Sequence, residues 1–325
     1  MRCMRKALVV GINDYIECPL KGCINDAERV SELLERNYDD SLNFEVELIK
    51  NVKSKGILYG KIRELFNDEN DIALFYYSGH GYVNELGGYI MTPDFVQDDW
   101  GIKMSDIVSY ANSSKSKNKI IILDCCYSGS IGNLQINEQI SAIGNGVTIL
   151  TASRNNETAS EVCGHGVFTQ LLEEALKGEA ANIQGEITPG SIYAYIDQAL
   201  GAWAAQRPLF KTNISSFVSI RNVKPRVSRD ELNILLECFS NVNGEFRLNP
   251  SFEFTNSLKM DIVPIEPYAN SQNVKIFKSL QRLESVDLVE PVDEEHMYFA
   301  AMKSKSCRLT PLGKYYWKLL KDKKI

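Results

Sequence analysis

A histidine and a cysteine follow two short apolar runs, and together they could perform nucleophilic catalysis. His80 lies in Ser78-Gly79-His80-Gly81, directly after the apolar residues 72–77, and Cys125 and Cys126 come soon after the apolar residues 120–123. The thiolate is the nucleophilic form of cysteine, and a nearby imidazole can take the proton of the thiol. Backbone N–H groups in glycine-containing turns can stabilise the oxyanion of an acyl-transfer reaction.

Both apolar runs are short and rich in β-branched or aromatic residues, and glycine follows each within a few positions. This pattern predicts two buried parallel strands that end in tight loops. In open α/β sheets, sites form at the edge where the strands end. We therefore expect His80 and Cys126 to meet there, although 46 residues separate them in the sequence. The alternative is structural, with both cysteines as small core residues and His80 as a loop histidine.

The rest of the N-terminal part alternates between strand-like and helix-like segments. This alternation predicts an α/β domain with a mainly parallel six-stranded sheet covered by helices on both faces. The expected strands are residues 6–12, 44–50, 72–77, 119–124, 147–151 and 215–220. The expected helices are residues 25–37, 55–67, 103–112, 166–177 and 189–203.

Several collinear blocks resemble the caspase-like cysteine peptidases, on the metacaspase and paracaspase side of that family. The clearest are Tyr77-Ser78-Gly79-His80-Gly81 and Asp124-Cys125-Cys126-Tyr127-Ser128-Gly129. The others are residues 7–15, 20–27, 150–154, 164–169 and 206–210, so the resemblance covers roughly residues 5–222. The second block differs from the Gln-Ala-Cys-Arg/Gln-Gly block of animal caspases. The resemblance implies that the six-stranded sheet is caspase-like and that its last strand is antiparallel.

The resemblance implies roles for individual residues. Cys126, two residues after Asp124, matches the nucleophile, and Cys125 should face the other side of the strand end. His80 matches the general base, and the backbone N–H groups of Gly81 and Cys126 would form the oxyanion hole. These assignments make the chain a cysteine endopeptidase with a His-Cys dyad.

The resemblance also implies a substrate pocket lined by Cys23, Asp26, Ser78 and Asp124. Two carboxylates in one pocket need a cation to offset their repulsion and desolvation. We therefore expect protein or peptide substrates with arginine or lysine before the cleaved bond, since arginine can pair with a carboxylate through two hydrogen bonds. Asp26 can also be interpreted as a residue at the start of a helix, and the two interpretations are compatible.

Activation is expected to proceed without internal cleavage and without a metal. The segment 127–153 contains no lysine or arginine, so an enzyme with basic specificity cannot cut itself there. Asp94, Asp98 and Asp99 are best interpreted as a solvated acidic turn, with calcium binding as the alternative. Eight scattered cysteines without a CxxC pair and only three histidines give no support for zinc, and unpaired cysteines fit a reducing cytoplasm. No apolar run is long enough to span a membrane, and the start lacks a signal-peptide core.

The sequence predicts a peptidase domain over residues 1–224 and a sensor or interaction domain over residues 225–325. The second domain resembles a winged helix, with helices near residues 272–285 and 310–321 and strands at residues 286–290 and 297–302. Residues 226–325 carry 15 basic and 14 acidic side chains, whereas residues 1–225 carry 21 basic and 28 acidic ones. Because a neutral module on an acidic body is a poor partner for phosphate backbones, nucleic acid is not the expected ligand.

By analogy, this domain organisation resembles bacterial immune or cell-death effectors, such as those of antiviral defence, that a partner protein or a nucleotide messenger switches on. The residues proposed for a nucleotide are Tyr268, Phe277, Tyr298, Tyr315 and Trp317 with Lys275 or Arg308, although most of these aromatics suit a core equally well. The alternative function is a transcription regulator or interaction scaffold in which the caspase-like part is a non-catalytic platform.

Overall fold

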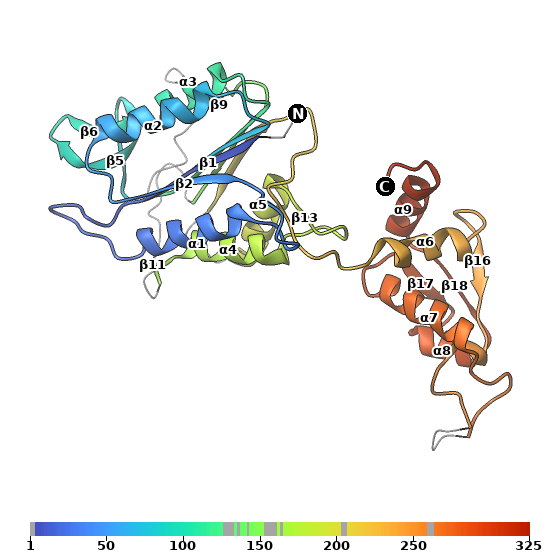
Figure 1. The fold of residues 1–325 in the computed structure, drawn as a ribbon. Coiled ribbons are helices and arrows are strands. Elements are labelled where there is room, and N and C mark those ends of the chain that lie inside the picture. Colours follow the sequence, from blue (N-terminus) through green and yellow to red (C-terminus); the bar gives the residue numbers. More distant parts are fainter. Residues whose placement is uncertain are drawn as a thin grey trace. The chain divides into compact units, whose positions relative to one another are not determined.

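The chain folds into two compact units, residues 1–224 and residues 225–325 (Figure 1). The computed structural model describes residues 4–125, 133–134, 137–141, 143–152, 161–162, 165–202, 207–258 and 263–325. Each unit has its own buried hydrophobic residues.

The first unit is built on a six-stranded sheet in the order β14-β10-β7-β3-β1-β2. Its strands are β1 (Arg5–Gly11), β2 (Glu45–Lys50), β3 (Ile72–Ser78), β7 (Asn118–Asp124), β10 (Val147–Thr151) and β14 (Leu209–Asn213). The first five are parallel, and β14 runs antiparallel to β10. The prediction of a mainly parallel six-stranded sheet is confirmed.

Helices cover both faces of this sheet (Figure 1). On one face lie α1 (Cys23–Glu35), α4 (Val167–Glu174) with its π-helical continuation (Ala175–Glu179), and α5 (Pro189–Leu200). On the other face lie α2 (Lys55–Asn67) and α3 (Met104–Ser113). Short two-residue strands complete the unit: β8 (Asn133–Leu134), β11 (Glu161–Val162), β12 (His165–Gly166), β13 (Glu186–Ile187) and β15 (Arg221–Asn222), with β9 (Asn137–Ser141) paired to β8.

The alternation of side chains along the buried strands produces two cores. On β3, Phe75 and Tyr77 join the core under α2 and α3, whereas Leu74 and Tyr76 join the core under α1, α4 and α5. Every residue of β3 is buried, which explains why its sequence is apolar throughout and not alternating. Two consecutive tyrosines at the end of this strand therefore point to opposite faces of the sheet.

Two parts of the first unit differ from expectation. The last strand of the sheet is β14, residues 209–213, and not residues 215–220. Residues 81–103 form a separate three-stranded antiparallel sheet of β4 (Gly81–Asn84), β5 (Gly87–Val96) and β6 (Asp99–Lys103). The acidic residues expected in a solvated turn lie in the hairpin between β5 and β6, where Asp98 takes the left-handed conformation with φ 71°.

The second unit combines helices with a three-stranded antiparallel sheet in the order β16-β18-β17. Its elements are α6 (Arg229–Cys238), β16 (Glu245–Arg247), a short 3-10 helix (Pro250–Phe252), α7 (Ser271–Glu284), β17 (Val289–Val292), α8 (Met297–Met302), β18 (Ser306–Leu309) and α9 (Pro311–Lys321). Ser228 and Glu231 form a capping box at the start of α6. The prediction of a strand at residues 297–302 is wrong, because α8 buries Met297, Ala300 and Ala301 at helical spacing.

None of the helices in the described part of the chain is long and apolar enough to cross a lipid bilayer.

Gly11, the last residue of β1, allows α1 to approach the sheet closely. A Cβ atom at this position would lie 2.3 Å from the carbonyl oxygen of Cys23 and 2.8 Å from Cβ of Ala27. We expect Gly11→Ala to lower the free energy of unfolding by about 1–3 kcal/mol, because α1 must shift to relieve the overlap. Urea denaturation followed by circular dichroism measures this change.

Gly60→Ala is the matched control, because a Cβ on this α2 glycine meets no heavy atom within 4 Å. It should leave stability unchanged or raise it by up to about 1 kcal/mol, as alanine favours helix. Equal effects of the two substitutions would contradict the close-approach explanation.

Candidate active site

His80 follows β3 directly, and a backbone carbonyl holds its ring. The Nε2 atom lies 2.7 Å from the carbonyl oxygen of Cys18, and the ring packs edge-on against Tyr15 with centroids 4.6 Å apart. Because a carbonyl only accepts hydrogen bonds, Nε2 must be the donor in this contact. In the neutral ring, Nδ1 then remains as the nitrogen that can accept a proton, which is the form that a general base requires.

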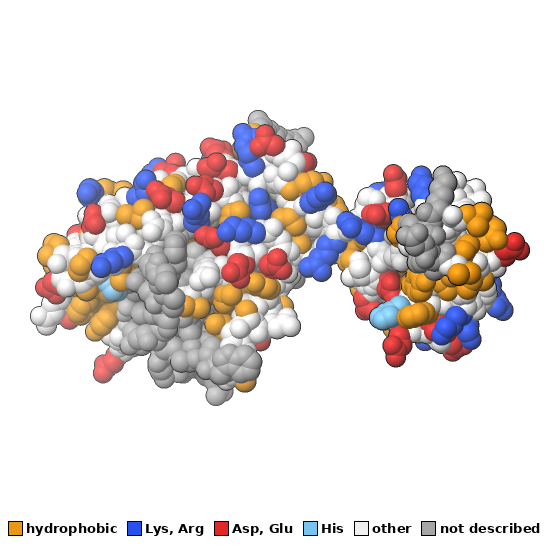
Figure 2. Space-filling view, turned by 90° about the horizontal axis from the view of Figure 1, so that it is seen from below, with side chains coloured by type: hydrophobic (Ala, Val, Ile, Leu, Met, Phe, Trp, Pro, Cys, Tyr) orange, Lys and Arg blue, Asp and Glu red, His pale blue; other side chains and the backbone are white. Residues whose placement is uncertain are grey.

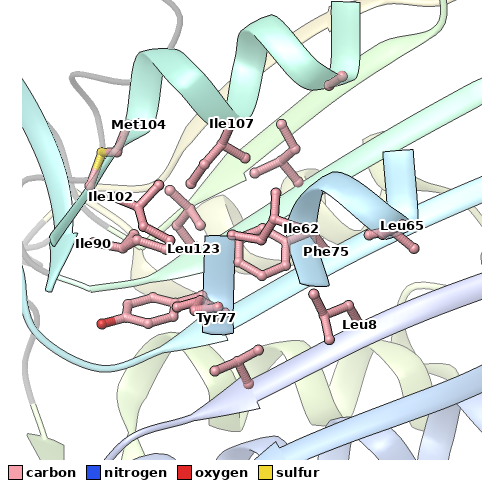
Figure 3. Close-up of a cluster of buried hydrophobic side chains, with 14 of the residues drawn as sticks. Leu8, Ile62, Leu65, Phe75, Tyr77, Ile90, Ile102, Met104, Ile107 and Leu123 are labelled. Carbon is pink, nitrogen blue, oxygen red and sulfur yellow. The ribbon is translucent and has the colours of Figure 1, made fainter. Parts of the chain in front are cut away.

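Two buried tyrosine hydroxyls fix the backbone of the His80 loop. The hydroxyls of Tyr15 and Tyr77 lie 3.0 Å apart, and the Tyr15 hydroxyl accepts the N–H of His80 at 3.1 Å. The Tyr77 hydroxyl donates toward the carbonyl oxygens of His80 at 2.9 Å and Met91 at 2.8 Å. Figure 3 shows the Tyr77 ring in the core under α2 and α3, with its hydroxyl at the edge of the apolar cluster.

The tyrosine pair also explains why glycine precedes His80. A Cβ atom on Gly79 would lie 2.5 Å from the Tyr77 hydroxyl and 2.6 Å from the Tyr15 hydroxyl. Only glycine leaves room for both hydroxyls to reach the backbone of the loop. Gly79 is therefore a requirement of packing as well as of the turn.

The residues expected to line the substrate pocket lie at the ends of adjacent elements. Ser78 ends β3 and is the register partner of Asp124, which ends β7, while Cys23 and Asp26 lie in the first turn of α1. All four side chains are buried, and the two carboxylates are only 2% and 5% exposed for Asp26 and Asp124, respectively. The structure thus brings acidic groups to the carboxyl edge of the sheet. His80 lies at the same edge, in the loop that follows β3.

Both carboxylates lie on the α1 side of the sheet, the side that the Tyr76 hydroxyl also faces. Burial raises the pKa of Tyr76 well above its ordinary value, and the negative charges of Asp124 and Asp26 raise it further. Tyr76 also shares a hydrogen bond of 2.6 Å with the hydroxyl of Thr169, which donates to Oδ2 of Asp124 at 2.6 Å. Asp124 is therefore held by side chains as well as by its place in the sheet.

Cys126, the predicted nucleophile and second oxyanion-hole residue, lies outside the described residues. Its neighbour Cys125 is 2% exposed and packs in the core under α2 and α3, as a structural cysteine does. Gly81, the other predicted oxyanion-hole residue, is the first residue of β4. The assignment of the dyad, the oxyanion hole and the pocket stays a prediction.

Two of the three acidic residues proposed as an alternative calcium site, Asp94 and Asp99, contact Lys55. Both carboxylate oxygens of Asp94 accept the backbone N–H of Lys55 at the start of α2, at 2.9 and 3.0 Å, and Asp99 pairs with Nζ of Lys55 at 2.6 Å. In the described part of the chain, no group of three or more histidine, cysteine or acidic side chains is placed to hold a metal ion. The interpretation as a solvated acidic turn, with calcium binding as its alternative, stays a prediction.

Sequence reasoning assigns no role to five contributors to this site: the Cys18 carbonyl and the side chains of Tyr15, Tyr76, Tyr77 and Thr169. Tyr15 and Thr169 lie in blocks that carry the family resemblance, so their positions were noticed without a role being assigned. Tyr76 looked like one more apolar residue of a buried strand. The Cys18 contact uses a backbone atom, which any residue at that position would supply.

Comparison with known proteins identifies the family. Residues 4–217 match the sequence model of the caspase domain, which is more than half of the chain, so the chain belongs to the caspase domain family. This is a family of cysteine peptidases, the class that the two motifs predicted. The chain is also 35% identical over 153 residues to Metacaspase-1 of Plasmodium berghei (strain Anka). That match covers 40% of this chain and 25% of the relative, so the chain spans about a quarter of the length of that curated protein.

A solved structure agrees on the fold. Protein GSU0716 from Geobacter sulfurreducens superposes with a TM-score of 0.50 at 14% sequence identity, covering 68% of this chain and 98% of that chain. At this identity, the likeness concerns the fold alone.

The buried tyrosines make the stability of the site sensitive to alkaline pH. Burial raises the pKa of Tyr77 well above the value near 10 that an unfolded chain has. The stabilisation that comes with neutral Tyr77 is thus complete below about pH 10 and is lost as the pH rises further. We expect Tyr77→Phe to reduce the steepness of this loss by about 1.4 kcal/mol per pH unit, measured by urea denaturation between pH 8 and 11.

Tyr38→Phe serves as the control, since Tyr38 is 53% exposed and should leave the steepness unchanged. At neutral pH, Tyr77→Phe should itself cost about 1–3 kcal/mol, because the hydrogen bonds to the carbonyl oxygens of His80 and Met91 and the contact with the Tyr15 hydroxyl are lost in a buried site. Identical alkaline profiles for wild type and Tyr77→Phe would show that this hydroxyl is not held as described.

Proposed function

We propose that the chain is a cysteine endopeptidase that cleaves after arginine or lysine, with His80 and Cys126 as its catalytic dyad. The observation that carries the proposal is the placement of an anchored His80 and the buried Ser78–Asp124 pair at one edge of a caspase-domain sheet. Acid–base chemistry and an acidic recognition group then lie side by side. Such a combination suits a peptidase for cationic substrates better than a binding platform.

The chemistry follows from the geometry of His80. Nδ1 accepts the proton of the Cys126 thiol, and the resulting thiolate attacks the carbonyl carbon of the scissile peptide bond. The N–H groups of Gly81 and Cys126 stabilise the oxyanion. As the C–N bond breaks, His80 returns the proton to the leaving amine, and a thioester remains. Water, deprotonated by His80, then hydrolyses the thioester and releases the free thiol.

Specificity follows from the buried carboxylates. Asp26 and Asp124 lie at a desolvated edge where a substrate aspartate would be repelled and a cation attracted. An arginine side chain can form paired hydrogen bonds with a carboxylate, which suits a pocket with a fixed acidic group. The proposal therefore excludes the aspartate preference of animal caspases.

Fluorogenic peptides that end in arginine, lysine or aspartate test this proposal on the full chain. Wild type should cleave the arginine and lysine peptides and leave the aspartate peptide intact. Cys126→Ala and His80→Ala should lower kcat/KM by roughly a thousandfold or more, because each removes half of the dyad. Asp124→Asn should lower kcat/KM for arginine by about a hundredfold, because the substrate cation loses its charged partner.

Cys125→Ala is the matched control for the nucleophile, and it should keep most of its activity, since Cys125 belongs to the core. Activity should not require added calcium. The active protein should also stay uncut between residues 127 and 153, as a denaturing gel can show. Cleavage of the aspartate peptide, or full activity of Cys126→Ala, would refute the proposal.

We further propose that residues 225–325 regulate the peptidase, as a winged-helix-like module that receives an activating signal. The sheet order β16-β18-β17 and the order of the helices around the sheet support the likeness to a winged helix. The biological setting that we propose is a bacterial immune or cell-death response, in which unregulated cleavage after basic residues would harm the host.

The surface of this unit favours a protein partner over a nucleotide. Phe277 and Trp317, two of the aromatics considered for stacking, are buried in the core, and Arg308 pairs with Glu290 at 2.6 Å. In contrast, several apolar side chains are exposed, and Figure 2 shows hydrophobic groups gathered on one face of the unit. The exposed ones include Phe254, Leu258, Val263, Ile265, Tyr268, Tyr298 and Phe299. Exposed apolar side chains in such number are typical of protein contact surfaces.

Removal of residues 226–325 tests the regulatory role. If the unit restrains the peptidase, the shortened protein should cleave the arginine peptide at least about fivefold faster than the full chain, the lower end of ordinary coupling between sites. Circular dichroism and thermal unfolding of the shortened protein show whether its fold is retained. An unchanged rate from a folded protein would argue against regulation by this unit.

A further inference from the structure

A chain of two short hydrogen bonds leads from the core to the proposed recognition carboxylate. Thr169 in the first turn of α4 connects the Tyr76 hydroxyl with Oδ2 of Asp124, at 2.6 Å on each side. The three residues are 0%, 1% and 5% exposed for Tyr76, Thr169 and Asp124, respectively. No step of the mechanism above uses Tyr76 or Thr169, although both are polar and fully enclosed.

The direction of the hydrogens in this chain is determined. Thr169 donates its hydroxyl hydrogen to Asp124. Since a hydroxyl has one hydrogen only, the hydrogen in the other contact must come from Tyr76. Burial together with the charges of Asp124 and Asp26 keeps that phenol protonated by raising its pKa. Tyr76 therefore donates to Thr169, and Thr169 donates to the carboxylate, which stabilises the negative charge of Asp124 and restrains the orientation of its oxygens.

The neighbouring tyrosine on the same strand does something different. Tyr77 faces the opposite side of the sheet, where its hydroxyl contacts Tyr15 and the carbonyl oxygen of His80. The end of β3 thus sends one hydroxyl toward the catalytic histidine loop and the preceding hydroxyl toward the acidic group.

We propose that Thr169 is a positioning residue for substrate recognition and that Tyr76 holds it in place. Tyr76 thereby supports substrate binding, whereas Tyr77, on the opposite face of the sheet, supports the catalytic rate. The proposal rests on the proposed function, in which Asp124 pairs with the substrate cation. Thr169 does not touch the substrate; it acts through the orientation of the Asp124 carboxylate.

This role has a signature that a merely structural hydroxyl would not produce. A guanidinium forms two parallel hydrogen bonds with a carboxylate and so depends on the plane of its oxygens, whereas an ammonium is a point charge. Loss of the Thr169 hydroxyl should therefore weaken arginine substrates more than lysine substrates. A loss of charge or of general stability would affect both alike.

The test uses full-length Thr169→Val and Tyr76→Phe with arginine and lysine fluorogenic peptides. For Thr169→Val, KM for arginine should rise about tenfold, as expected for a lost hydrogen bond to a charged group, while kcat stays within about twofold, as for uniform binding. The preference for arginine over lysine should shrink, and Thr169→Ser should restore it. Tyr76→Phe, which keeps the threonine hydroxyl, should act in the same direction, whereas Tyr77→Phe should lower kcat and leave KM unchanged.

Thr148→Val is the matched control, because Thr148 is 1% exposed and bonds the Thr212 hydroxyl at 2.9 Å between β10 and β14. It should leave KM, kcat and the arginine preference unchanged. An unchanged KM in both Thr169→Val and Tyr76→Phe would overturn the positioning role and leave the peptidase proposal intact. An equal rise of KM for the arginine and lysine peptides would have the same consequence. If Thr169→Val does not fold, Thr169→Ser and Tyr76→Phe decide the question.

Calorimetric binding of agmatine, a guanidinium without a peptide bond, separates the two proposals. If wild type binds agmatine more tightly than Thr169→Val but cleaves no basic peptide, the positioning role stands and the peptidase function fails. If wild type neither binds agmatine nor cleaves basic peptides, both fail.

Discussion

The parallel register between β3 and β7 is the constraint on which both halves of the candidate site depend. It sets Ser78 opposite Asp124, so that the loop carrying His80 starts beside the acidic residue. Because side chains alternate along a strand, a slip of one residue would exchange the faces of Tyr76 and Tyr77. The histidine loop would then lose its hydroxyl partner Tyr77, and Thr169, which donates to Asp124, would lose its hydroxyl partner Tyr76. The buried apolar residues of β3 make such a slip costly, since they fill two different cores.

Buried hydroxyls at the end of a strand are costly unless they are fully hydrogen-bonded, and here they are bonded to functional groups. Tyr77 donates to the carbonyl oxygens of His80 and Met91, and Tyr76 donates to the hydroxyl of Thr169. Their desolvation is offset only if those loop and helix atoms stay in place. The core therefore holds the site rigidly because its own polar groups would otherwise be unsatisfied. Such coupling explains how an edge built from loops can keep a defined geometry.

Much of the fold could be predicted because the central strands are apolar and end abruptly. Residues 72–78 and 118–124 are strands within one or two positions of the prediction. The last strand could not be placed, because its position depends on pairing with β10, including the Thr148–Thr212 contact, and not on local propensity. The aromatic residues of the segment 297–302 favour a strand, but the segment is a helix. Met297, Ala300 and Ala301 show the spacing of a helix face.

The candidate site divides into parts that a sequence can and cannot reveal. His80 and Asp124 stand in motifs directly after predicted strands, so their meeting follows from topology. The Cys18 carbonyl leaves no trace in the sequence, because every residue provides one. Tyr15 and Thr169 are different, because their hydroxyls are specific to the side chain and lie in segments far from β3 in the sequence. A tyrosine or threonine that no local element requires can thus indicate a distant polar partner. Tyr15 is such a residue on the α2 and α3 face of the sheet, and Thr169 is one on the α1 and α4 face.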